Sequence, residues 1–260
     1  MLSKRLAFSY QEKLYLLLTI LVLSFILSFR DWGVNKFDFL LGIRNLVIAV
    51  LLVSLSLLVK LYVQKYFAHR VGFIVEFRPW LLGLLIGLIF VFVSNGTLTF
   101  LAIGGLTFYV IERLKVGRAD IGGHGSPGWI SIAGPITNLV LAAFFKVFTP
   151  VPLLEHIAVT AVSINLLIAF FGMLPIPFIE GFTFENLRKT RSSDGLQFLH
   201  SSLLEYLIVA ISGLATGLAI WFSPPSYAIG TTLIFLVVVR GIYYIFYQQN
   251  IPQDRVRKAI

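Results

Sequence analysis

Apolar residues run along this chain in long blocks rather than in the short alternating patterns of a soluble protein. A helix of about 20 mostly apolar residues spans a bilayer. Six blocks approach or exceed that length: 14–29, 41–63, 128–148, 155–176, 204–223 and 227–247. The pattern predicts an all-α polytopic membrane protein with six transmembrane helices, forming a single integral membrane domain over residues 1–260.

The region 80–114 fits this pattern less well. Its two apolar halves are short and are separated by Ser94, Asn95 and Gly96, and the second half is rich in threonine, glycine and β-forming residues. Irregular backbone at membrane depth is tolerated only where protein or a cavity surrounds it. The region is therefore either a pair of short crossings or a re-entrant hairpin that contains β-structure.

The distribution of charge predicts the orientation. The chain has 21 basic and 12 acidic residues, a net charge of +9, and most basic residues fall in the segments 1–13, 60–79, 113–127, 178–203 and 248–260. These segments lie on one side of the membrane in the six-helix arrangement, which the positive-inside rule makes the cytoplasmic side. We expect a multi-pass protein of the cell membrane with both termini cytoplasmic. The basic excess indicates the lipid bilayer as a partner, and no nucleic acid.

Composition also limits the chemistry. The chain has no cysteine, which excludes disulfides and any cysteine-ligated metal. Charged residues make up 13% of the chain, about half the share in soluble proteins, so each charge within a span is a candidate for function.

Three segments together carry a family resemblance: AHRVGFIVEFRPW (68–80), SIAGPITNLVLA (131–142) and INLLIAFFGMLPIPFIEG (164–181). They resemble the site-2 protease family of intramembrane zinc metalloproteases, which has an AGP-x-x-N segment, an N-x-x-P-x-P-x-L-D-G segment and an earlier H-E-x-x-H helix ahead of a glycine. The resemblance covers about residues 45–185. It implies a site-2-protease-like core, followed here by a helical pair at 204–247.

The catalytic positions of that family are altered in this chain. Counting back from Gly72 at the family's spacing places Lys60 and Gln64 where the family has its zinc-binding histidines, and Leu61 where it has its general-base glutamate. Glu180 stands at the position of the aspartate ligand. In the family these groups activate a zinc-bound water. We therefore expect no catalytic residues and no zinc, and interpret the chain as a pseudoprotease.

A carboxylate and an amine remain at the former metal position. We expect Lys60 and Glu180 to form an ion pair there, with Gln64 hydrogen-bonding the same carboxylate. The alternative is that Lys60 extends to the inner membrane surface and Glu180 faces water.

The resemblance further implies that transmembrane segments of client or partner proteins bind to the retained groove. Segment 98–112 matches, in position and composition, the strand with which the family pairs an unwound substrate; a short packed helix is the alternative. The expected binding positions are Gly104, Gly105, Asn138, Asn165, Pro175 and Pro177.

Other functions remain open from sequence. An active intramembrane metalloprotease would need an unorthodox zinc site, for which His124, Glu180 and a carboxylate such as Asp120 are candidates. Ser56 and Lys60 lie one helical turn apart, as a serine–lysine nucleophile pair would require. A transporter or channel subunit is a third class, but the chain shows no internal repeat and few intramembrane charges.

Overall fold

The computed structural model describes residues 7–33, 37–101, 103–110, 126–178 and 192–248. Within them the chain order is α2 (Tyr10–Ser28), α3 (Phe39–Val71), β1 (Phe73–Arg78), α4 (Leu81–Val93), β2 (Gly105–Val110), α5 (Ser126–Lys146), α6 (Glu155–Met173), α8 (Asp194–Ser201), α9 (Leu203–Phe222), α10 (Pro225–Ile242) and the π-helical turn η2 (Tyr243–Gln248).

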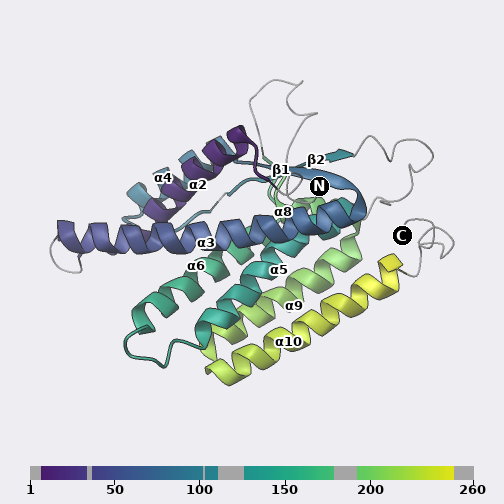
Figure 1. The fold of residues 1–260 in the computed structure, drawn as a ribbon. Coiled ribbons are helices and arrows are strands. Elements are labelled where there is room, and N and C mark those ends of the chain that lie inside the picture. Colours follow the sequence, from purple (N-terminus) through teal and green to yellow (C-terminus); the bar gives the residue numbers. More distant parts are fainter. Residues whose placement is uncertain (1–6, 34–36, 102, 111–125, 179–191, 249–260) are drawn as a thin grey trace.

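Six of the described helices are long and apolar enough to cross a membrane: α2, α3, α5, α6, α9 and α10. In Figure 1, α3, α5, α6, α9 and α10 form the body of the bundle, and α2 and α4 cover α3 from the other side. Two large apolar clusters fill the interior, one around α2, α3 and the sheet and one around α5, α6, α9 and α10. The predicted fold class, an all-α polytopic membrane protein, is confirmed.

The region 80–114 begins with the short helix α4 and returns as extended chain. The turn between them contains Asn95 and Gly96, both with positive φ, at 51° and 74°. The returning chain ends in strand β2, which pairs with β1 in an antiparallel two-stranded sheet. The described residues therefore show the β-structure that was expected in the second half of this region.

The sheet has one closed edge. In antiparallel pairs, the backbone groups of alternate residues point toward and away from the partner strand. The Phe77 N–H donates to Glu12 Oε1 over 2.9 Å, and the Val75 carbonyl accepts from Lys65 Nζ over 3.1 Å. The edge of β1 that faces away from β2 is therefore held by side chains of α2 and α3.

A buried ion pair joins those two side chains. Lys65 Nζ lies 2.9 Å from Glu12 Oε2, and both side chains are almost fully buried. The Glu12 carboxylate also accepts from the Ser9 N–H in a capping box at the start of α2. One side chain therefore both caps α2 and binds the edge of β1. This pair fixes the amino-terminal helix to the sheet.

We predict that Glu12→Leu lowers the free energy of unfolding by about 3–5 kcal/mol, because it leaves a buried lysine without a counter-charge. The measurement is denaturant-induced unfolding of the full chain in detergent micelles. Glu76→Leu is the matched control: it removes the same charge from a partly exposed pair with Arg78, 3.6 Å apart, and should change stability by less than about 1 kcal/mol. Equal effects of the two substitutions would contradict the structural role of Glu12.

Candidate functional site

Lys60 and Gln64 lie one turn apart on α3, and both point into the bundle. Lys60 is 3% exposed and Gln64 is fully buried. Gly134 of α5 faces them so closely that a Cβ there would lie 2.4 Å from Gln64 Nε2 and 2.6 Å from Lys60 Cε. A glycine at this position is therefore what allows α5 to approach the two polar side chains.

The Lys60 ammonium is paired with Asp194. Its Nζ lies 2.7 Å from Asp194 Oδ2, and both side chains are buried. The sequence-based alternative in which Lys60 extends to the membrane surface is therefore wrong. The expected partner, Glu180, lies outside the described residues, and the carboxylate that the structure places on Lys60 is Asp194.

Burial and charge act in opposite directions on Asp194. Burial raises the pKa of its carboxyl above the ordinary value of 3.8, while the Lys60 charge and hydrogen bonding from Lys60 and Gln64 lower it, with burial the largest effect. The predicted hydrogen bond from Gln64 to Glu180 stays a prediction, because Glu180 lies outside the described residues.

The Pro-x-Pro segment positions Asp194 at the start of α8. Ser193, the N-cap of α8, accepts hydrogen bonds from the Leu196 and Ile176 N–H groups and donates to the Leu174 carbonyl. The segment therefore holds the helix whose first residue carries the carboxylate. The adjoining chain is fixed by an isolated bridge between Pro177 and Ser192.

A chain of hydrogen bonds connects Gln64, one turn along α3 from Lys60, to the sheet. Gln64 Nε2 donates to the Ser131 carbonyl over 2.7 Å, and the Ser131 hydroxyl donates to Gln197 Oε1. Gln197 Nε2 in turn donates to the Leu106 carbonyl of β2 over 3.0 Å. The strand is thereby tied to α3, α5 and α8 through side chains that are at least half buried.

A small cavity adjoins Lys60. Its volume is about 10 Å³, and its lining includes Lys60, Gly104, Gly172 and Phe178. A space of this size holds about one water molecule. The cavity as it stands is too small for a peptide side chain, so any bound segment must lie along its rim.

The other predicted binding positions differ in how deeply they are buried. Gly104, with φ of +121°, and Gly105 are buried at the start of β2, where a Cβ would collide with the Arg78 and Ser192 carbonyls respectively. Asn138 and Asn165 are fully buried in α5 and α6. Pro175 and Pro177 are exposed. Gly104 lines the Lys60 cavity, and Gly105 and the two prolines lie in the chain that adjoins it. Among the described residues, Asn165 donates to the Ala161 carbonyl of its own helix rather than to the Lys60 site.

Two enzymatic alternatives receive no support from the described residues. Ser56 is buried and its hydroxyl donates back to the Leu52 carbonyl over 2.8 Å, so it is engaged with its own helix rather than with Lys60. The His124, Glu180 and Asp120 set lies outside the described residues.

The residues at the predicted metal position do not fit zinc. Zinc sites use imidazole, thiolate and carboxylate donors, and here an ammonium group, an amide and one carboxylate converge. The ammonium would repel a dication and already occupies the carboxylate. Among the described residues, no group of three histidine, cysteine or acidic side chains is placed to hold a metal.

Sequence reasoning missed Asp194, Ser131 and Gln197. Asp194 follows two serines and precedes Gly195, a pattern typical of a helix start, and a buried lysine requires one of only 12 acidic residues in the chain. These two signals together would have made Asp194 a candidate for the ion-pair partner of Lys60. Nothing local marks Gln197, because its role depends on the three-dimensional approach of β2.

The chain was compared with known proteins. It is 30% identical over 178 residues to a protein of Methanocaldococcus jannaschii that bears the name putative zinc metalloprotease; the match covers 67% of this chain and 83% of that protein. No protein-family model matches the chain, and no solved structure matches it.

We predict that Lys60→Met makes the stability of the protein strongly dependent on pH. Without the opposing cation, burial raises the pKa of Asp194 further, so the folded state holds a proton that the unfolded state releases near pH 3.8. Stability must then fall as pH rises from about 4 through the folded pKa, and the loss at pH 8 should reach about 3–5 kcal/mol.

The measurement is unfolding of wild type and variants between pH 4 and pH 8. The double variant Lys60→Met/Asp194→Asn should recover part of the loss and should lack the added pH dependence. Additive effects of the two substitutions, or a Lys60→Met variant with the same pH profile as wild type, would show that the pair carries no coupling energy.

Proposed function

The chain belongs to the same metalloprotease-like family as its Methanocaldococcus jannaschii relative, and we propose that it is a non-catalytic member, resembling site-2 proteases, which binds membrane segments of other proteins without cutting them. The observation that carries this proposal is the buried Lys60–Asp194 pair at 2.7 Å. It stands where the family resemblance puts a metal-binding histidine.

The chemistry at this position argues against hydrolysis. A metalloprotease needs an open metal coordination position for water and a base to take its proton. The residue at the base position is Leu61, which is buried and has no ionisable group. Lys60 is engaged by Asp194, and the adjoining cavity has room for about one water molecule.

The edge of β2 that faces away from β1 is the proposed binding surface. Val75 and Phe77 turn their backbone groups away from β2, and they stand opposite Phe108 and Leu106. The backbone groups of Phe108 and Leu106 therefore point to the far edge of β2. Gln197 Nε2 donates to one of these groups, the Leu106 carbonyl, and no described strand pairs with this edge.

An extended peptide can add to such an edge through backbone hydrogen bonds. Because α2 and α3 close the opposite edge, at β1, a client would be directed to β2. The client class is a membrane-spanning segment that has locally unwound, and the lipid bilayer is the second partner. The charge distribution in the sequence supports a cell-membrane location with both termini in the cytoplasm.

We predict that the purified full-length protein holds far less than one zinc per chain and does not cleave model transmembrane substrates in a chelator-sensitive way. Metal content is measured by mass spectrometry of the intact preparation, and cleavage by gel analysis after reconstitution. A stoichiometric zinc with chelator-sensitive cleavage would establish the alternative, an active metalloprotease with an unorthodox site.

We also predict that Phe108→Pro weakens the capture of an unwound membrane segment about tenfold. The substitution removes the outward-facing N–H of β2 while leaving the residues that bond β1 intact, because Phe108 faces Val75 in a non-hydrogen-bonded pair. Phe108→Leu is the matched control, since it loses the ring contact with Phe73 but keeps the N–H.

Capture is measured by photo-crosslinking from position 107 to a membrane-spanning peptide that carries a central Asn-Pro pair. Equal losses in the proline and leucine variants would mean that side-chain packing, and not backbone pairing, holds the client. Full capture by both variants would place the client elsewhere.

A further inference from the structure

A second cavity lies at the opposite end of the bundle from the sheet. It has a volume of about 140 Å³ and is lined by Lys146, Thr149, Val159, Val162 and Trp221. These residues come from the end of α5, the chain that follows it, α6, and the last turn of α9. In Figure 1 the α5–α6 connection lies far from β1, β2 and α8. The cavity is therefore distinct from the Lys60 site.

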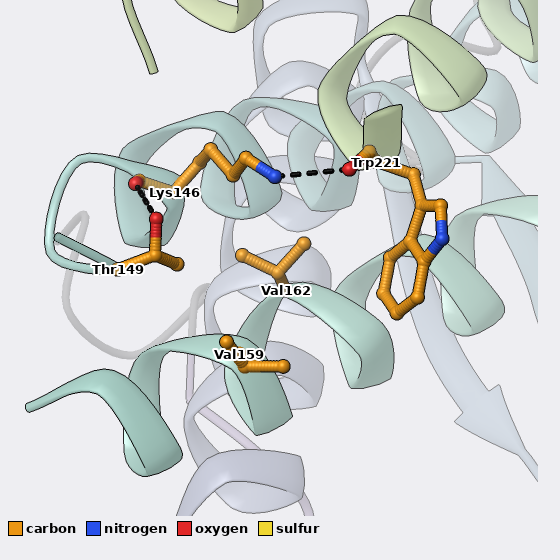
Figure 2. Close-up of a pocket in the computed structure, with 5 residues that line it drawn as sticks. All are labelled: Lys146, Thr149, Val159, Val162 and Trp221. Atoms are coloured by element: carbon orange, nitrogen blue, oxygen red, sulfur yellow. Dashed lines mark hydrogen bonds between the residues drawn. The ribbon is translucent and has the colours of Figure 1, made fainter. Parts of the chain in front are cut away.

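The walls and the rim of this cavity differ in chemistry. Figure 2 shows the two valines of α6 below the cavity, the Trp221 side chain beside it and the Lys146 side chain reaching across toward the Trp221 backbone. Val162 is buried, whereas Val159 and Trp221 are 41% and 45% exposed. The cavity thus opens onto the outer, lipid-facing surface of the bundle. Its volume is close to that of an apolar cavity of about 150 Å³ that admits benzene.

The Lys146 ammonium has hydrogen-bond donors and a positive charge available to bind a ligand. Its Nζ donates to the Trp221 carbonyl over 3.0 Å, which satisfies one backbone group at the end of α9. An ammonium group has three donors, and no carboxylate among the described residues pairs with this one. Thr149 donates its hydroxyl to the Lys146 carbonyl, and Lys146 is the one charged residue among the five that line the cavity.

We infer that this cavity is a binding site for an anionic phospholipid, with the headgroup phosphate on Lys146 and part of an acyl chain against Val159, Val162 and Trp221. An amphiphile of this kind matches a cation above apolar walls at the end of three membrane-spanning helices. Tryptophan beside the site is typical of the headgroup level of a bilayer. A soluble anion would leave the apolar walls unused, and a neutral hydrocarbon would leave the charge unpaired.

The test uses the full-length protein in nanodiscs that contain a photoactivatable phosphatidylglycerol, with the labelled residues mapped by mass spectrometry. Label should appear on the segments of α6 and α9 that line the cavity. Unlabelled phosphatidylglycerol should compete at about fivefold lower concentration than phosphatidylcholine with the same chains, the preference that one basic residue near an anionic lipid confers.

Three variants and one control separate the contribution of the Lys146 charge to lipid binding from that of the cavity itself. Lys146→Gln should abolish the fivefold preference, and Lys146→Arg should keep it. Val159→Trp, which fills the cavity from a partly exposed position, should remove labelling by either lipid. Arg44→Gln is the matched control, because it removes an exposed cation outside the cavity and should leave labelling unchanged.

Two results would overturn the inference. One is a failure of the charge preference: equal competition by the two lipids in the wild type would mean that the site does not select a negative charge, and an effect of Arg44→Gln as large as that of Lys146→Gln would reduce the preference to general surface charge. The other is undiminished labelling in Val159→Trp, which would place the lipid outside the cavity.

Discussion

The ion pair between Lys60 and Asp194 is the constraint around which the core of this protein is arranged. An ammonium and a carboxylate taken out of water each lose several kcal/mol of hydration, which only close contact and further hydrogen bonds offset. Close contact requires α3, α5 and α8 to meet at one place, and Gly134 permits that approach. Ser193, the N-cap of α8, is hydrogen-bonded to Ile176 and Leu174 at the Pro-x-Pro segment, and these bonds hold the Asp194 carboxylate beside Lys60.

Helix α3 carries two such buried lysines, and they connect it to different parts of the fold. Lys60 joins it to α8, and Lys65 joins it to α2 and the closed edge of the sheet. Gln64, between them, begins the hydrogen-bond path that reaches the other strand, β2. The sheet is therefore positioned from both strands by polar side chains of one membrane helix and their partners. This arrangement explains how a two-stranded sheet, marginal by itself, is held at the end of a helical bundle.

The span pattern, the β-structure after α4 and the position of Lys60 and Gln64 inside the bundle were accessible from sequence, because hydrophobic length and the spacing before Gly72 are local signals. The partner of Lys60 was not. Family spacing pointed to Glu180, whereas the structure places Asp194 on the lysine, 14 positions later in sequence. Which carboxylate reaches a buried amine depends on tertiary structure, here on the Ser193 cap that starts α8, and the family motif ends before that residue. Glu12 was missed for the same reason: its partners lie 53 and 65 positions away in the chain.

An ion pair and a metal centre make a fold depend on different conditions. A structural or catalytic zinc links folding to the supply of metal and to the protonation of its ligands. The Lys60–Asp194 pair supplies a cross-helix connection from the chain alone, but it requires that water stay out, since hydration would favour separated charges. The adjoining cavity of about 10 Å³ has room for about one water molecule, so little water can reach the pair. A groove suited to hydrolysis must admit water to the reacting centre, so the small space beside this pair supports the proposed non-catalytic role.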